Sequence, residues 1–177
     1  MKKLYLLRHG QTEFNVKKLV QGRCDSPLTD LGRQQAGMAA AWLKGHGVVP
    51  DKVVSSSLGR AMDTAQLVAC ELLGPDAAAE PCEGIIERSC GTFEEGPHGA
   101  LPTDVWDPGE DLVPFGGEGS QALQERMVDA LTNIMGSEGI ETLLAVSHGS
   151  ASRQFIKAAA PEGFELPTKL PNCAIMI

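Results

Sequence analysis

Two histidines in the sequence each follow closely on a short apolar run. Arg8 and His9 come directly after the residues "LYLL", and His148 comes one residue after "LLAV". A neutral imidazole is a good nucleophile near pH 7, and an arginine offers planar, forked donors that match phosphate oxygens. This combination of residue types is suited to the transfer or hydrolysis of a phosphoryl group.

Further polar groups fall at expected turns and could complete such a site. Arg60 adds a second cation, and the carboxylic acid of Glu87 could protonate a leaving alcohol. Gly10 and Gly149, each next to a histidine, let backbone amides approach a ligand closely. The formal net charge is −8, so a cluster of arginines would be a local reversal of sign that favours a compact anion.

The elements that must position these groups alternate along the chain. Short apolar runs at 3–7, 51–57, 143–146 and 173–177 indicate strands, and helical spacing indicates helices within 26–45, 58–74, 118–136 and 150–160. This alternation predicts an α/β fold, a three-layer, doubly wound and mostly parallel sheet with helices on both faces. Parallel sheets hold ligands at the carboxyl ends of their strands, which is where both histidines fall.

The expected helix within 26–45 has clear signals at both ends. Thr29 is suited to the N-cap, while Gly45 and Gly47 supply the stop. Its spacing predicts an inward face formed by Leu31, Gln35, Met38, Ala39, Trp42 and Leu43. Residues 91–117 are rich in Gly, Pro and Asp and lack periodicity, so we expect a loop that acts as a lid over the site.

Length and composition narrow the class of protein. The 177 residues suit one domain, 1–177, with the lid as an insertion. The negative charge argues against nucleic-acid and anionic-membrane partners, and no apolar run reaches the roughly 20 residues of a membrane helix. The apolar start is too short for a signal peptide, and five cysteines without C-x-x-C spacing favour free thiols, so we expect a cytoplasmic protein. A homodimer is compatible with the sequence.

Six motifs carry a resemblance to a known family. In order they are "LRHGQTEFN", "GRCDSPLTDLGRQQA", "SSSLGRAMDTA", "IIERSCGTFEEG", "FGGEGS" and "AVSHGS", spanning residues 7–150. Together they resemble the histidine phosphatase superfamily, in the branch that includes cofactor-dependent phosphoglycerate mutases and small phosphomonoesterases. Order and spacing both agree with that family.

The resemblance implies a role for each matching residue. His9 would attack phosphorus and become a phosphohistidine, and Glu87 would be the general acid and then the base for water. The phosphoryl oxygens would be held by Arg8, Arg60 and His148, assisted by Asn15 and the amide of Gly149, with Arg23 and Arg88 as further substrate-binding residues. No metal or organic cofactor is implied, because the arginines neutralise the phosphoryl charge.

The lid departs from what a mutase needs. Between Arg88 and Arg126 there is no Lys or Arg, and the same stretch holds Glu94, Glu95, Asp104, Asp107, Glu110, Asp111, Glu118 and Glu125. Such a lid is expected to repel a second anionic group, which favours a phosphomonoesterase acting on a small phosphorylated metabolite. A cofactor-dependent phosphoglycerate mutase and a non-catalytic phosphate-binding module are the alternatives. The extra glycine in "FGGEGS" and the cysteine at position 90 leave the roles of Glu118 and Cys90 open.

Overall fold

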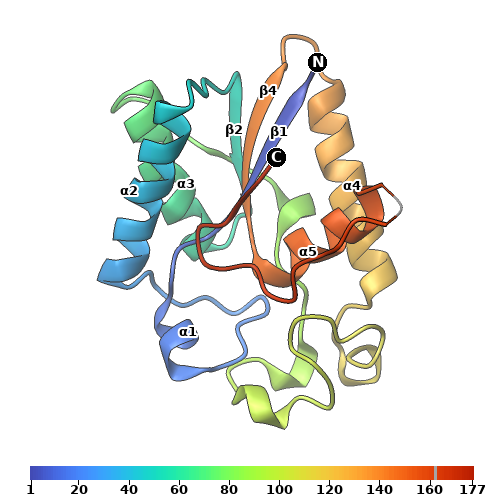
Figure 1. The fold of residues 1–177 in the computed structure, drawn as a ribbon. Coiled ribbons are helices and arrows are strands. Elements are labelled where there is room, and N and C mark those ends of the chain that lie inside the picture. The colour runs from blue at the N-terminus through green and yellow to red at the C-terminus, as the bar shows by residue number, and fades with distance from the viewer. Residues whose placement is uncertain (162) are drawn as a thin grey trace.

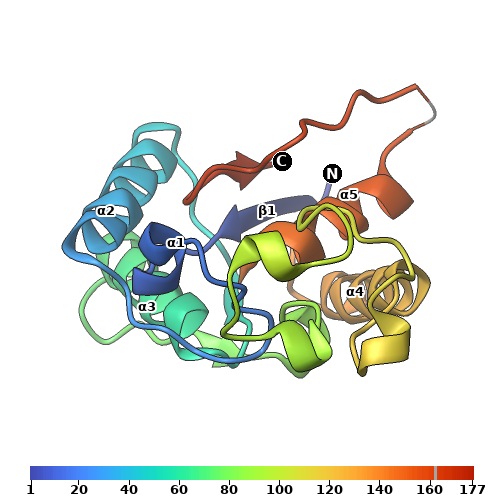
Figure 2. The same ribbon diagram turned by 90° about the horizontal axis from the view of Figure 1, so that it is seen from below.

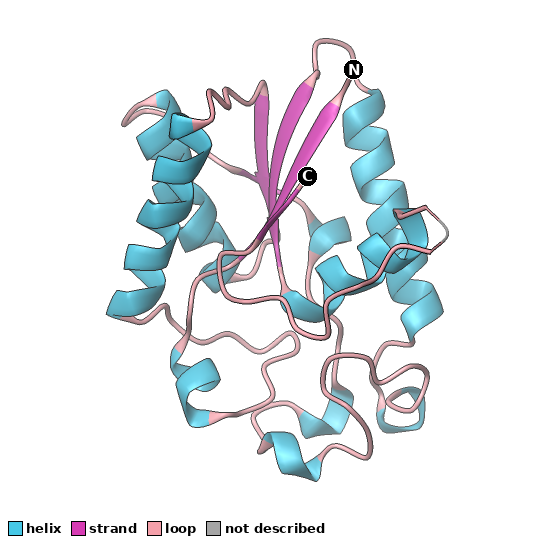
Figure 3. Ribbon diagram, in the orientation of Figure 1, coloured by secondary structure: helices cyan, strands magenta, loops and turns pink. Residues whose placement is uncertain are grey.

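The computed structural model describes residues 1–161 and 163–177 of the chain, which fold around a five-stranded sheet in the order β3-β2-β4-β1-β5 (Figures 1 and 3). The strands are β1 (Lys3–Arg8), β2 (Lys52–Ser55), β3 (Glu80–Pro81), β4 (Thr142–Ser147) and β5 (Ile175–Met176). The first four run parallel, and β5 pairs antiparallel with β1. The predicted mostly parallel α/β sheet is therefore confirmed.

Helices cover both faces of this sheet, as Figure 2 shows. They are α2 (Asp30–Gly45), α3 (Gly59–Leu73), α4 (Ser120–Gly136) and α5 (Gly149–Ala159), whereas the short α1 (Glu13–Lys17) lies beyond the carboxyl ends of the strands (Figure 1). On one face α2 and α3 pack against each other, and on the other face α4 packs against α5. The sequence predicted all of these helices except the short α1, which is held by a capping box between Thr12 and Asn15.

Neighbouring residues on each central strand enter opposite cores. Leu7 of β1 packs with Val53 and Leu144 beneath α2 and α3, whereas Leu6 packs with Val54 and Leu143 beneath α4 and α5. Both side-chain rows of a central parallel strand are thus buried, which explains why β1 and β4 have continuous apolar sequences rather than alternating ones.

The buried face of α2 differs from the predicted one. Leu31, Met38 and Trp42 are exposed, and the helix instead buries Ala36, Ala39, Ala40 and Leu43. The physical reason is that the alanines permit a close approach to α3 and the sheet, so the bulky side chains lie on the outer side. The predicted N-cap is confirmed, because Thr29 Oγ1 accepts a hydrogen bond from Gly32 N at 3.0 Å.

Residues 91–117 form a connection with three short 3₁₀ turns, at Gly91–Phe93, His98–Ala100 and Val113–Phe115. In Figure 1 this lid lies below the carboxyl ends of β1, β2 and β4, beside α1. The expectation of a long, mostly irregular segment over that edge of the sheet is confirmed. Among the helices of the described chain, none combines the length and apolar character needed to cross a membrane.

Candidate active site

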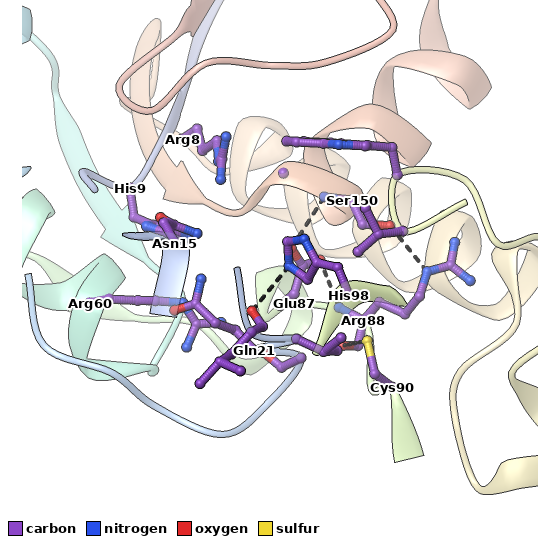
Figure 4. A pocket seen from close by; sticks show the side chains of 16 residues that line it. Arg8, His9, Asn15, Gln21, Arg60, Glu87, Arg88, Cys90, His98 and Ser150 are labelled. Carbon is purple, nitrogen blue, oxygen red and sulfur yellow. Dashed lines mark hydrogen bonds between the residues drawn. The ribbon is translucent and has the colours of Figure 1, made fainter. Parts of the chain in front are cut away.

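A pocket opens at the carboxyl ends of the central strands (Figure 4). Its walls come from the end of β1, the loop before α2, the start of α3, the segment after β3, the lid and the start of α5. Of the nine residues predicted for the site, seven line this pocket: Arg8, His9, Asn15, Arg60, Glu87, Arg88 and Gly149. His148 lies directly behind His9, and Arg23 lies at the rim.

His9 is the first residue after β1, and its ring is almost fully buried. Nδ1 donates a hydrogen bond to the carbonyl oxygen of Gly10 at 2.7 Å, which leaves Nε2 with a free lone pair. Burial lowers the pKa of His9 well below 6.5, and the nearby charges of Arg60 and Arg8 lower it further. The imidazole is therefore neutral at pH 7, in the form that a nucleophile requires.

Gly10 fixes the turn that presents His9. Its amide donates to Thr64 Oγ1 of α3 at 3.0 Å, and Thr64 in turn donates to the carbonyl of Arg60 at 2.8 Å. A Cβ at position 10 would collide with the carbonyl of Gly32 in α2. Only glycine lets the turn after His9 lie this close to α2, so a larger residue at position 10 is excluded on steric grounds.

Two buried arginines face the histidine from different elements. Arg60 of α3 donates from Nη1 to Cys24 O at 2.8 Å and from Nη2 to Gly22 O at 2.7 Å, and Arg8 donates from Nη1 to Leu170 O. In both side chains the Nε atom is buried without a partner among the described residues. Burial lowers the pKa of Arg8 to about 10, which still leaves the guanidinium charged at pH 7.

His148 packs edge-on against His9, with ring centroids 5.1 Å apart and planes at 61°. The Oγ of Ser56 lies 2.7 Å from His148 Nε2 and accepts a hydrogen bond from Leu58 N at 3.3 Å, so the Ser56 hydroxyl is placed to donate to Nε2. Burial, followed by the charge of Arg60, lowers the pKa of His148 well below 6.5. When the neutral ring accepts this hydrogen bond at Nε2, its own proton is on Nδ1. Nδ1 is buried and has no partner among the described residues.

These three buried donors indicate which kind of ligand the pocket can bind. An unsatisfied buried donor is costly, and native proteins rarely keep one without a function or a ligand. Here Arg8 Nε, Arg60 Nε and His148 Nδ1 come from three separate elements; Arg8 and Arg60 line the pocket with His9, and the His148 ring packs against His9. A tetrahedral oxyanion such as a phosphoryl group offers acceptors to all three at once.

Glu87 is held at the N-terminus of α5. Its Oε1 accepts hydrogen bonds from Arg88 N and Ala151 N, both at 2.8 Å, and its Oε2 accepts one from Ser150 N at 3.2 Å. These backbone donors fix the carboxyl group in the pocket wall, as Figure 4 shows. Oε2 therefore accepts one of these hydrogen bonds and Oε1 accepts two.

Asn15 is oriented by a residue that the sequence analysis missed. Its Oδ1 accepts from Thr12 N and from Asn172 Nδ2, both at 3.1 Å, so its own Nδ2 amide is left as a donor toward the pocket. Asn172 also donates to the carbonyl of His9 at 3.1 Å. The segment before β5 therefore positions both His9 and Asn15.

The structure places the two remaining arginines differently from the prediction that they bind substrate. The Arg88 guanidinium turns away from the pocket and donates to Ser150 Oγ, Gly109 O, Glu118 O and Ser120 Oγ at 2.7–3.1 Å (Figure 4). Arg23 lies outside the pocket wall, 3.5 Å from Glu118, with Nε 3.4 Å from the Glu87 carbonyl. Arg88 links the lid to α5 through hydrogen bonds to both, and Arg23 contacts Glu118 and the Glu87 carbonyl at the edge of the pocket.

The acidic residues of the lid do not face the pocket, so the expected repulsion from this surface is wrong. Among the described residues, Glu87 is the one carboxylate in the wall. Glu94 binds the amides of Arg23, Cys24 and Cys90, Glu110 binds the amide of Gln121 at the start of α4, and Glu118 pairs with Arg126. These acids are used as caps and braces, which sequence composition could not reveal.

The part of the lid that does reach the pocket is formed by His98, Val105 and Trp106. The Trp106 ring lies 5.1 Å from the Arg8 guanidinium carbon, and its edge covers Gly149, where a Cβ would come within 2.8 Å of the indole. Trp106, Ser56 and Asn172 are thus site residues that the sequence analysis did not single out. For Ser56 the one available signal is its place in the motif "SSSLGRAMDTA".

Comparison with known proteins gives a consistent picture. A family model described as the histidine phosphatase superfamily (branch 1) matches residues 4–177. By sequence, the chain is similar to a probable phosphoglycerate mutase of Cronobacter sakazakii (32% identity over 182 residues, 99% of this chain and 83% of that protein). It is also similar to a broad-specificity phosphatase of Saccharomyces cerevisiae (32% over 166 residues, 88% of this chain and 69% of that protein).

Solved structures resemble the fold over nearly the whole chain. A phosphoserine phosphatase mutant from Entamoeba histolytica has a TM-score of 0.77 at 30% identity, covering 99% of this chain and 89% of that one. A mycobacterial glucosyl-3-phosphoglycerate phosphatase has a TM-score of 0.81 at 26% identity, covering 99% of this chain and 91% of that one.

Proposed function

The chain belongs to the histidine phosphatase superfamily (branch 1), and from that membership and the site geometry we propose that it is a phosphomonoesterase that works through a phosphohistidine. The observation that carries this proposal is the neutral His9, with Nε2 free, in a site that also holds three buried donors that have no partner among the described residues. This arrangement supplies a nucleophile and the means to stabilise the charge that develops on the phosphoryl oxygens.

In the first step, His9 Nε2 attacks phosphorus and the bond from phosphorus to the ester oxygen breaks. The donors on Arg8, Arg60 and His148 hold the phosphoryl oxygens while this happens. Glu87, in its carboxylic acid form, gives its proton to the departing alkoxide, so that the product leaves as an alcohol. The phosphoryl group is then bonded to Nε2, and Glu87 is a carboxylate.

In the second step, a water molecule takes the place of the alcohol. The Glu87 carboxylate accepts a proton from this water as it attacks phosphorus, and the bond from Nε2 to phosphorus breaks. Inorganic phosphate is released, and both His9 and Glu87 return to their starting forms. Because Glu87 is fixed by backbone amides of α5 and of Arg88, it stands at the same place for both proton transfers.

A phosphatase is favoured over a mutase by the character of the lid residues that reach the pocket. A mutase must retain an intermediate with two phosphate groups, which requires cations for both. The lid residues that reach this pocket are His98, Val105 and Trp106, and none of them is a lysine or arginine. The relatives include proteins named as phosphatases and proteins named as phosphoglycerate mutases, so the preference for a phosphatase rests on these lid residues.

A quenched-reaction experiment tests the proposal. With p-nitrophenyl phosphate, the wild-type protein should release phosphate and yield an acid-labile, base-stable label on His9. His9→Ala should lower turnover by roughly 10⁴-fold or more. His46→Ala changes an exposed histidine at the end of α2 and serves as the matched control. Full turnover in His9→Ala, or net conversion of 3- to 2-phosphoglycerate at the rate of phosphate release, would contradict the proposal.

A further inference from the structure

The pocket has a second wall, formed by segments that do not carry the phosphoryl donors. It is built by the loop before α2 and by the lid, two segments that Figures 1 and 2 show beside each other. Its residues are Leu19, Val20, Gln21, Cys90, His98, Val105 and Trp106. In the proposed reaction the leaving alcohol lies against this wall, because the phosphoryl group itself is held by side chains of other segments.

The arginines around the pocket either face the phosphoryl position or are bound by other protein groups. Arg8 and Arg60 face the phosphoryl position, and the guanidinium of Arg88 is engaged by four acceptors on the lid, α4 and α5. Arg23 at the rim pairs with Glu118. Within the described residues, therefore, the wall offers no free cation to a carboxylate or a second phosphate on the leaving group.

Trp106 is a fixed part of this wall. The next residue, Asp107, accepts hydrogen bonds from Gln154 at 2.7 Å and Lys157 at 3.2 Å, both on α5. Burial raises the pKa of Asp107, but these hydrogen bonds outweigh the burial and leave the pKa lowered, so Asp107 is charged at pH 7. This anchor holds the indole against Arg8 and Gly149, where it presents an apolar surface to the leaving group.

Two polar groups on the wall complete its chemistry. Gln21 Oε1 accepts from Thr12 Oγ1 at 2.8 Å, which leaves the Gln21 amide nitrogen as a donor. His98 donates from Nε2 to the Leu19 carbonyl at 3.1 Å, and in this tautomer Nδ1 is an acceptor. A donor and an acceptor set in an otherwise apolar wall are suited to a hydroxyl group rather than to an ion.

We infer that the substrate is the phosphate monoester of an uncharged alcohol with a flat or aliphatic body that packs on Trp106 and Val105. This inference rests on the proposed phosphatase activity and deepens it. Esters of acidic alcohols such as phosphoserine and 3-phosphoglycerate would have to bury a carboxylate against Leu19, Val105 and Trp106 without a cation. Burying an unpaired charge is strongly unfavourable, so these compounds are expected to be poor substrates.

The test compares four esters of aliphatic alcohols: 2-phenylethyl phosphate, ethyl phosphate, O-phosphoserine and 3-phosphoglycerate. We expect kcat/KM for 2-phenylethyl phosphate to exceed that for ethyl phosphate by about tenfold or more, and both acidic esters to fall below ethyl phosphate. Trp106→Ala should lower kcat/KM for 2-phenylethyl phosphate several-fold more than for ethyl phosphate. Trp106→Phe should keep most of the preference, and Val113→Ala, an exposed lid position outside the pocket wall, should keep all of it.

The outcomes separate the two proposals. Hydrolysis of phosphoserine or 3-phosphoglycerate at or above the rate of ethyl phosphate would overturn the inference and leave the phosphatase assignment intact. An equal loss on all esters in Trp106→Ala would also overturn it, since the indole would then serve only the phosphoryl site. Absence of both phosphate release and a phosphohistidine with every ester would overturn the phosphatase assignment itself.

Discussion

Replacing Gly149 by alanine isolates one steric requirement of the phosphoryl site. Gly149 is the first residue of α5, and an added Cβ would lie 2.8 Å from Trp106 Cζ3 and 3.4 Å from Arg8 Nε. The indole would have to shift, and the new methyl group would crowd the unpartnered Nε donor. The backbone amide of residue 149 is unchanged, so the variant tests close approach and not loss of that amide.

The structure gives the size of the effect. A hydrogen bond to a charged group contributes about 1.5–3 kcal/mol. Loss of the one from Arg8 Nε to the phosphoryl group should therefore lower kcat/KM by about 10- to 150-fold. Stability should not fall in parallel, because alanine in place of glycine in a helix gains roughly 0.5–1 kcal/mol, which offsets the displacement of a side chain.

The assay measures kcat/KM with p-nitrophenyl phosphate, the inhibition constant of inorganic phosphate and the thermal midpoint. The first two should worsen by similar factors, while the midpoint is maintained. Gly37→Ala in α2 is the matched control, since its Cβ would meet nothing within 4 Å, and it should be active and slightly more stable. Wild-type kcat/KM and phosphate inhibition in Gly149→Ala would refute the placement of the phosphoryl group beside Arg8 Nε.

Four further predictions follow from the site. Glu87→Gln should slow ethyl phosphate far more than p-nitrophenyl phosphate, because nitrophenolate leaves without a proton; equal losses would remove the general-acid role. Since the folded chain holds the pKa values of His9 and His148 well below 6.5, the unfolded chain binds more protons below that pH. The thermal midpoint should therefore fall as pH drops from 7 to 5, and less steeply in His148→Gln; an unaltered slope would count against the buried neutral ring. Asn172→Leu removes the donor to the carbonyl of His9 and to Asn15, and should lower kcat/KM about tenfold, whereas unchanged kinetics would refute the positioning role. EDTA should leave phosphate release unchanged, and a loss restored by Mg²⁺ would contradict the proposed reliance on arginines.

Much of the fold could be predicted from the sequence because its signals are local. β1 and β4 are continuous apolar runs, and α2 carries both its Thr29 cap and its glycine stop within a few residues. Strands that alternate with helices then limit the topology to a mostly parallel sheet. The same rule brings His9 and His148 to one edge, so their proximity in the structure was predictable before any contact was known.

The sequence-based predictions are wrong where a residue's environment depends on contacts with segments far away in the sequence. Trp42 was assigned to the core because its spacing on α2 is correct, but the alanines that pack on α3 determine which side of the helix is buried. Asp107 was interpreted as a repulsive charge, yet its partners are on α5, about fifty residues further along the chain. Asn172 has no motif at all, and its role depends on β5 pairing with β1.

The position of β1 within the sheet has a consequence for biosynthesis. β1 ends at Arg8, whereas its two partner strands, Thr142–Ser147 and Ile175–Met176, come more than a hundred residues later in the chain. At 5–20 residues per second, β1 waits roughly 7–30 s for its first neighbour. Throughout that time the apolar sequence of β1 has no partner strand, so the centre of the sheet cannot form before β4 has been synthesised.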